Sequence, residues 1–233
     1  MTASRLVVWR HGQTSWNAEE RMQGQVDIPL DATGLAQARA IAPELAVFRP
    51  GALYTSDLSR TRQTAETLAA LTGLPIREDK RLREIDTGSI SGLTRAEFLD
   101  RYPELRINAG PDDRRGGDGE SERQVATRIA ACLTDIARAH DDGATVVAAT
   151  HGVAARVGVC ALVGLPTPSW RALGGLSNAS YVVVGRYGKL SPETDDDERP
   201  GHVWRIVEWG VGDAARRMSV EPGGESADEL PRG

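Results

Sequence analysis

Short apolar runs alternate along the chain with longer stretches in which hydrophobic residues recur every three to four positions. The short runs favour β-strands and lie at 5–9, 52–55 and 145–150. Helical spacing follows them or lies between them, in segments at 34–47, 57–72, 94–101, 122–139 and 153–162. This alternation predicts the α/β class, as a three-layer αβα sandwich in which helices cover both faces of a mostly parallel sheet.

The C-terminal part departs from this alternation. Two extended runs, at 179–185 and 202–210, are joined by a polar loop and predict a hairpin that gives the sheet an antiparallel edge. The loop carries the acidic run 195–198, which we interpret as solvated, because no histidine or further carboxylate has metal-ligand spacing to it. Periodicity ends after residue 213, so we expect one domain over 1–213 and a flexible tail over 214–233.

Composition narrows the class of protein and its partners. A chain of 233 residues, 40% hydrophobic and 26% charged, fits one globular domain with a sizeable core. Its net charge of -5, without a long basic run, argues against a nucleic-acid partner. The N-terminus lacks an apolar stretch of signal-peptide or membrane-span length, and the two cysteines lie in apolar patterns. We therefore expect a cytoplasmic protein with no membrane partner and a small solute as its ligand.

Two of the four histidines follow predicted strands and precede a glycine. His11 comes after the run at 5–9, and His151 comes after the run at 145–150. Open α/β sheets bind ligands at the carboxyl ends of their strands, so we expect both histidines at one rim. Glycine leaves room for a close backbone approach, and a helix that begins behind it offers free N–H groups to an anion. Two hydrogen-bonded structural histidines would give the same pattern.

Arginines accompany these histidines. Arg10 precedes His11, and Arg60 follows the third predicted strand, where Ser56 or Asp57 can cap a helix and hold Arg60 in its first turn. Guanidinium groups suit phosphate oxygens, so this rim is a candidate anion pocket. The alternative candidates for the second cation are Arg62, Arg81 and Arg83.

Glu84 is the candidate proton donor. It follows an extended segment and precedes a glycine-broken loop. A carboxyl group at that place can donate a proton to a leaving oxygen. Spacing alone equally allows a surface ion pair with Arg81 or Arg83.

A cysteine-dependent phosphatase is a further hypothesis, because Cys132 and Arg138 are separated by five residues, as the cysteine and arginine of such an active-site loop are. Such a cysteine needs a loop of backbone N–H groups at a helix start. Here Cys132 lies mid-helix, on one apolar face with Val125, Ile129 and Ile136. We interpret the match as accidental.

Taken together, the motifs resemble the histidine phosphatase superfamily, also called the phosphoglycerate mutase-like family. The similarity runs from residue 5 to about 185, and its parts occur in the family's order. They are "RHGQTSWN" (10–17), "QGQVDIPLDATGLAQA" (23–38), "YTSDLSRTRQTAETLA" (54–69), "LREIDTGSISG" (82–92), "GGDGESERQVATRI" (116–129) and "VVAATHG" (146–152).

The resemblance implies hydrolysis of a phosphomonoester through a phosphohistidine. His11 would attack phosphorus, Arg10, Arg60 and His151 would hold the phosphoryl oxygens, and Glu84 would protonate the leaving group and then help activate water. The chemistry would need neither a metal nor a cofactor, and family analogy suggests a homodimer. The resemblance also places substrate-binding positions at Asn17, Gln23, Gly24 and Gly152.

Two stretches indicate a substrate class. "SWRALGGLSNASYVVV" (169–184), together with "RMQGQVD" (21–27), resembles actinobacterial glucosyl-3-phosphoglycerate phosphatases, which implies a small phosphorylated metabolite that carries a carboxylate. Candidates to meet that carboxylate are Arg21, Arg83 and Arg156. The chain departs from many relatives at Ile90 and Ser91, where a tryptophan and an acidic or amide residue are frequent, and at Val153, where a second glycine is frequent. These departures put the substrate range in doubt.

Two alternatives stay open. A cofactor-dependent phosphoglycerate mutase would keep the phosphohistidine and pass it to a second hydroxyl, but mutases usually carry a longer insertion than 85–120 over the site. A non-catalytic phospho-ligand binding module would show affinity without turnover. Retention of His11, Arg10 and Glu84 favours the enzyme.

Overall fold

A six-stranded sheet forms the centre of the computed structural model, which describes residues 2–103, 110–188 and 202–212. The strand order is β3-β2-β4-β1-β5-β6. β1 to β4 run parallel, β5 is antiparallel to β1, and β6 is antiparallel to β5. The strands are β1 (Arg5–Arg10), β2 (Ala52–Thr55), β3 (Ile76–Glu78), β4 (Thr145–Thr150), β5 (Tyr181–Gly188) and β6 (His202–Val211).

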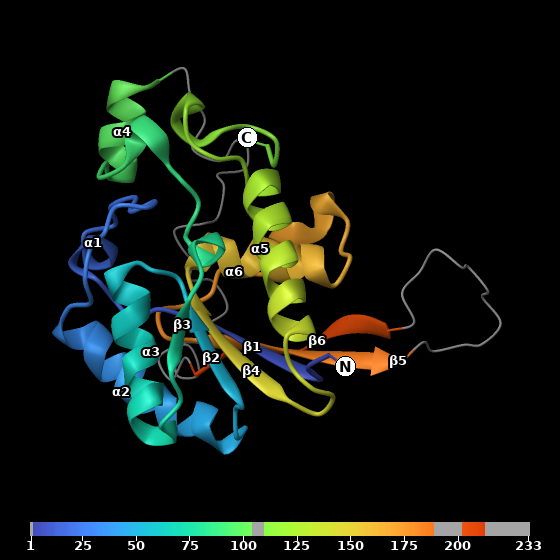
Figure 1. Ribbon diagram of the computed structural model, residues 1–233. Helices are drawn as coiled ribbons and strands as arrows, with labels where there is room; N and C mark the ends of the chain where they lie inside the picture. The colour runs from blue at the N-terminus through green and yellow to red at the C-terminus, as the bar shows by residue number, and fades with distance from the viewer. Residues whose placement is uncertain (1, 104–109, 189–201, 213–233) are drawn as a thin grey trace, which may run out of the picture.

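Helices cover both faces of this sheet, which confirms the predicted α/β architecture with its antiparallel edge (Figure 1). Along β1, Leu6 and Val8 pack into the core beneath α5 and α6, whereas Val7 and Trp9 pack beneath α2 and α3. This period-two alternation is what a strand buried on both faces produces. The helices are α1 (Ser15–Ala18), α2 (Ala32–Val47), α3 (Ser59–Thr72), α4 (Arg95–Arg101), α5 (Glu122–Arg138) and α6 (Gly152–Leu162).

The predicted cap of α3 is wrong. The helix begins at Ser59, and neither Ser56 nor Asp57 caps it. The carboxylate of Asp27 accepts the Ser59 N–H at 2.7 Å and the Ser59 hydroxyl at 2.8 Å instead. Asp27 precedes Ser59 by 32 positions, so a local reading of the sequence around the helix start could not identify it. Arg60 still lies in the first turn, as predicted.

The sequence reading missed two short elements. β3 has three residues of which two are exposed, so it lacks the apolar alternation that marks a strand. The four-residue helix α1 is closed by a capping box between Thr14 and Asn17, and it buries none of its residues.

The described residues confirm the C-terminal hairpin but leave other predictions untested. β5 and β6 pair antiparallel at the edge of the sheet. The acidic run 195–198 and the tail 214–233 lie outside the described residues, so the domain boundary stays a prediction. Among the residues described, no helix combines the length and apolar character that crossing a bilayer requires.

Candidate active site

The two His-Gly pairs meet at the carboxyl ends of neighbouring strands. His11 follows β1 and His151 follows β4, and the last residues of these strands, Arg10 and Thr150, lie in register. The ring centroids of His11 and His151 are 5.2 Å apart, with an interplanar angle of 64°. His11 is 3% exposed and His151 is fully buried. The arrangement therefore places two imidazoles side by side at the rim where ligands of open α/β sheets bind.

The surroundings of His11 fix its tautomer. Its Nδ1 lies 2.6 Å from the carbonyl oxygen of Gly12, and a carbonyl can only accept, so Nδ1 carries the proton. Burial, and then the charges of Arg60 and Arg10, hold the pKa of His11 well below its ordinary 6.5. The ring is thus neutral at physiological pH and has an unprotonated Nε2, the state that a nucleophile requires.

His151 has the opposite tautomer. Arg60 donates from Nε to His151 Nδ1 at 3.1 Å, so the proton lies on Nε2, which donates to Ser56 Oγ at 2.9 Å. Ser56 Oγ also lies 2.7 Å from Thr61 Oγ1. Burial, followed by the charge of Arg60 and the neighbouring His11, lowers the pKa of His151 well below 6.5. His151 can therefore act as a neutral hydrogen-bond donor through Nε2.

Both rings are expected to stay neutral as the pH falls through 6.5. The unfolded chain takes up protons on these histidines near pH 6.5, whereas the folded chain does not. The free energy of unfolding should therefore be undiminished above pH 6.5 and fall below it, by about 1.4 kcal/mol per pH unit for each histidine. Urea unfolding against pH, with imidazole NMR shifts, measures this. His11→Asn should reduce the slope, and titration of either ring at 6.5 or above would contradict the prediction.

Arg60 is a fully buried cation beside both histidines. Besides its bond to His151, it donates from Nη1 to the Val26 carbonyl at 2.7 Å and from Nη2 to the Gly24 carbonyl at 2.8 Å. Burial lowers its pKa to about 10, which leaves it charged at neutral pH. Gly24 has a φ of 50°, and a Cβ there would meet Thr87 Oγ1 at 2.2 Å. A glycine is required at position 24, and its carbonyl orients Arg60.

Arg10 supplies the second cation. It donates from Nη1 to the carbonyl of Leu176. A Cβ on Gly152 would lie 3.4 Å from the Arg10 Cζ, so the guanidinium packs against the first residue of α6. Together, Arg10 and Arg60 surround His11 with positive charge, and this arrangement suits a phosphoryl group.

The carboxylate of Glu84 lies at the N-terminus of α6. It accepts the N–H groups of Val153 at 3.1 Å and Ala154 at 2.9 Å, together with that of Ile85 at 2.8 Å. This end of the helix begins directly after His151. Glu84 is therefore positioned at the same rim as the histidines. Val153 binds it through its backbone N–H, which every residue except proline supplies, so a valine in place of the frequent glycine keeps this bond.

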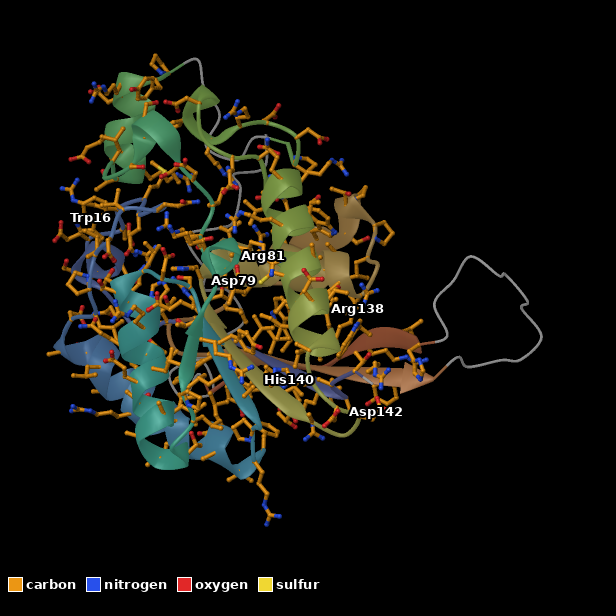
Figure 2. The ribbon with its side chains drawn as sticks, viewed as in Figure 1. Trp16, Asp79, Arg81, Arg138, His140 and Asp142 are labelled. Atoms are coloured by element: carbon orange, nitrogen blue, oxygen red, sulfur yellow. The ribbon has the colours of Figure 1, made fainter. Side chains whose placement is uncertain are left out.

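The surface ion-pair reading of Glu84 is wrong. Arg81 pairs with Asp79 at 2.8 Å and with Asp135 at 2.7 Å, and Figure 2 shows Arg81 and Asp79 beside α5. Arg83 pairs with Asp57 at 2.6 Å. Both arginines are thereby engaged by aspartates, which removes them as alternatives to Arg60.

Asn17 and Gln23 belong to a polar network around Thr14. Asn17 Oδ1 accepts the Thr14 N–H at 3.2 Å, and the Thr14 hydroxyl donates to Gln23 Oε1 at 3.0 Å. Asn178 donates to Asn17 Oδ1 at 3.1 Å and to the His11 carbonyl at 3.3 Å. The sequence reading missed Asn178, although it lies in the stretch 169–184 that indicated the substrate class.

The three arginines suggested for a substrate carboxylate all have carboxylate partners in the protein. Arg21 pairs with Glu19 and Glu97, and Arg83 pairs with Asp57. Arg156 lies 3.4 Å from Glu122. Of the departures from the family, Ile90 is buried, and Ser91 hydrogen-bonds within its own turn, to Thr87 at 2.7 Å and to the Gly88 carbonyl at 2.8 Å. Their effect on specificity stays a prediction.

The structure contradicts the hypothesis of a cysteine-dependent phosphatase. Cys132 is fully buried in the middle of α5, and burial raises the pKa of its thiol to about 12. Arg138 is the last residue of that helix (Figure 2). The described residues also contain no group of three or more His, Cys, Asp or Glu side chains arranged to hold a metal ion.

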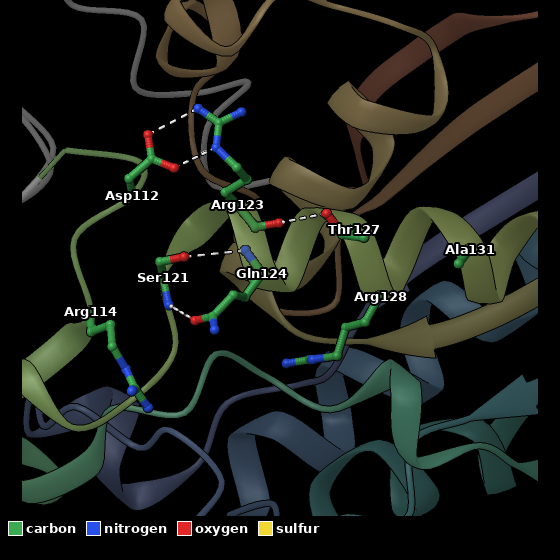
Figure 3. A pocket seen from close by; sticks show the side chains of 8 residues that line it. All are labelled: Asp112, Arg114, Ser121, Arg123, Gln124, Thr127, Arg128 and Ala131. Carbon is green, nitrogen blue, oxygen red and sulfur yellow. Dashed lines mark hydrogen bonds and ion pairs between the residues drawn. The ribbon is translucent and has the colours of Figure 1, made fainter.

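A cavity of about 590 Å³ lies beside α5, with none of the residues above in its lining (Figure 3). Its arginines are engaged by the protein: Arg114 by backbone carbonyls, Arg123 by Asp112 and Arg128 by Glu120. The cavity is thus distinct from the histidine site and presents no uncommitted cationic group from these three.

Comparisons with known proteins agree with this geometry. The family model described as the histidine phosphatase superfamily (branch 1) matches residues 6–191. A glucosyl-3-phosphoglycerate phosphatase of Mycolicibacterium vanbaalenii is 38% identical over 224 residues, covering 91% of this chain and 96% of the relative. A probable phosphoglycerate mutase of Enterobacter is 38% identical over 169 residues, covering 70% and 77%. A solved mycobacterial glucosyl-3-phosphoglycerate phosphatase complex with VO3 superposes with a TM-score of 0.79 at 34% identity, covering 89% of this chain and 98% of that one.

Proposed function

We propose, from the premise that this chain belongs to the histidine phosphatase superfamily, that it is a phosphomonoester phosphatase acting through a phosphohistidine at His11. The observation that carries the proposal is the neutral His11 ring, with an unprotonated Nε2 and with the charges of Arg10 and Arg60 acting on it. The substrate we propose is a small phosphorylated metabolite with a carboxylate, glucosyl-3-phosphoglycerate, because relatives at 36 to 38% identity bear the name of that phosphatase.

In the first step, His11 Nε2 forms a bond to phosphorus while the bond from phosphorus to the leaving oxygen breaks. Glu84 begins this step in its protonated form and donates that proton to the oxygen, which leaves as an alcohol. Phosphoryl transfer depends mainly on positioning and on stabilising charge, which the guanidinium groups of Arg10 and Arg60 supply. Splitting the reaction at a covalent intermediate replaces one difficult step with two easier ones.

In the second step, water attacks the phosphohistidine. Glu84 takes the proton from water, the bond from phosphorus to His11 Nε2 breaks, and inorganic phosphate leaves. His151 assists by turning its Nε2–H from Ser56 Oγ to a phosphoryl oxygen. Asn17, Gln23 and the backbone at Gly24 and Gly152 complete the pocket. The net reaction consumes one ester and one water and returns the enzyme unchanged.

The second candidate is a phosphoglycerate mutase, which the similarity to the Enterobacter relative favours. A mutase must exclude water from the phosphohistidine and return the phosphoryl group to a second hydroxyl. Both candidates share the first step, so only the fate of the phosphoryl group separates them.

Phosphate release from glucosyl-3-phosphoglycerate is expected to match alcohol release mole for mole. The rate should not change on addition of 2,3-bisphosphoglycerate or of a chelator, because no step uses either a phosphorylated cofactor or a metal. A colorimetric phosphate assay measures this. Comparison of 3-phosphoglycerate with glycerol 3-phosphate, which lacks the carboxylate, tests the substrate class. Isomerisation that requires 2,3-bisphosphoglycerate would establish the mutase, and a strict requirement for a divalent ion would refute the metal-free account.

We also propose that the enzyme acts in the cytoplasm and forms a homodimer, the latter by family analogy. Sedimentation of the full chain tests the dimer.

A further inference from the structure

Arg128 ties the backbone around Glu84 to helix α5. Its Nη1 donates to the carbonyls of Arg81 at 2.9 Å and Arg83 at 2.7 Å, and its Nη2 donates to the Glu84 carbonyl at 2.8 Å. Nε and Nη2 also donate to the two carboxylate oxygens of Glu120 at 2.8 and 2.7 Å. These bonds use all five N–H donors of the guanidinium. Figure 3 shows Arg128 extending from α5 toward this segment.

Glu120 holds the other side of the same segment. The Glu120 oxygen that accepts from Arg128 Nη2 also accepts the N–H of Asp86, at 2.9 Å. Gln25 adds a third constraint, because its Nε2 donates to the Glu84 carbonyl at 3.1 Å. The backbone is thus hydrogen-bonded before, at and after residue 84, and this fixes the point from which the Glu84 side chain reaches the N–H groups of Val153 and Ala154.

We propose that Arg128 and Glu120 act as a positioning pair that places the Glu84 carboxyl group for proton transfer to the leaving oxygen. The proposal rests on the proposed function, in which Glu84 is the proton donor. A general acid must lie within hydrogen-bond reach of its target, and a displacement of about 1 Å can cost on the order of 100-fold in rate. The hydrogen bonds of Arg128 reach Glu120 and the backbone around Glu84, and none of these bonds involves the histidines, Arg10 or Arg60. The charge of Arg128 also contributes to the lowered pKa of His151, and a lysine at 128 keeps that charge, so Arg128→Lys tests the positioning of Glu84.

The chemistry of the pair requires arginine. A lysine at 128 would keep the positive charge but offers three donors without the planar fork, so it cannot hold both the carbonyls and Glu120. The side chains of Arg128 and Glu120 are 21% and 24% exposed, and Arg128 lines the cavity of Figure 3. Water can therefore solvate the ammonium group of a shorter lysine, so Arg128→Lys does not bury an unpaired charge.

The test compares Arg128→Lys with Glu84→Gln over phosphate esters that range from nitrophenyl to alkyl leaving groups. Nitrophenolate leaves without a proton, whereas an alkoxide needs one. We expect Arg128→Lys to lose about 100-fold in kcat on alkyl esters and at most about 3-fold on nitrophenyl phosphate. Glu120→Gln should lose activity with the same selectivity, and Arg128→Lys combined with Glu84→Gln should be no slower than Glu84→Gln alone.

Arg123→Lys is the matched control, because Arg123 lies on the same helix and pairs with Asp112 at the surface. It should leave both classes of ester unchanged. If Arg128→Lys slows aryl and alkyl esters equally while Glu84→Gln is selective, the positioning proposal is overturned and the proposed function stands. If Glu84→Gln itself is unselective, the proton-donor role fails and the positioning role fails with it. Should Arg128→Lys not fold, Glu120→Gln decides the matter by the same criterion.

Discussion

Replacement of His11 by alanine is expected to lower turnover by a factor on the order of 10⁴ or more, because the covalent step then has no nucleophile. The cationic pocket of Arg10 and Arg60 would remain and still bind phosphate esters. His11→Asn separates chemistry from packing, since its amide can replace the Nδ1–H bond to the Gly12 carbonyl while offering no nucleophilic nitrogen. Both variants should therefore bind substrate and fail to turn it over.

Rapid quenching of the wild-type protein during turnover, without acid, should trap a phosphoryl group on His11. Subsequent treatment with acid should release it. His140→Ala is the control: this ring, labelled in Figure 2, contacts Tyr54. His140 precedes β4, whereas His151 follows it. It should retain full activity and full labelling. Label on another residue, or product formed by His11→Ala at an undiminished rate, would contradict the phosphohistidine mechanism.

The rim of the site could be predicted from the sequence because it depends on a local pattern. His11 and His151 each end an apolar run, and parallel strands present their carboxyl ends on one side, so the pattern indicated both residues without knowledge of strand order. That β4 and β1 are neighbours is a property of the folded sheet, and it brings the rings within contact of each other.

The partners that set the state of each catalytic candidate could not be predicted in this way. Ser56 and His151 are 95 positions apart, Asn178 and His11 are 167 apart, and Arg128 and Glu84 are 44 apart. Local periodicity carries no information about such pairs. Burial is also a tertiary property, and it is the largest cause of the low histidine pKa values on which the nucleophile depends.

Arg60→Lys is expected to lower both stability and activity, although it keeps the charge. Lysine cannot reproduce the fork that joins the carbonyls of Gly24 and Val26 to His151 Nδ1. Buried acceptors that lose their donors cost about 1 to 3 kcal/mol each, so with partial rearrangement we expect a loss of about 3 kcal/mol in the free energy of unfolding. Loss of one fixed donor to the phosphoryl group should cost about 10² to 10³ in kcat.

Arg62→Lys provides the matched comparison, two positions along the same helix. Arg62 is 51% exposed and meets Glu78 at 3.1 Å, so its replacement should change the free energy of unfolding by less than about 0.5 kcal/mol and leave kcat unchanged. Urea unfolding and steady-state kinetics on both variants measure the difference. Because Arg60 also fixes the tautomer of His151, Arg60→Lys should in addition alter the imidazole NMR shifts of that ring, which a loss of packing alone would not do. Equal stability and equal kcat in the two variants would contradict both the structural and the catalytic role assigned to Arg60.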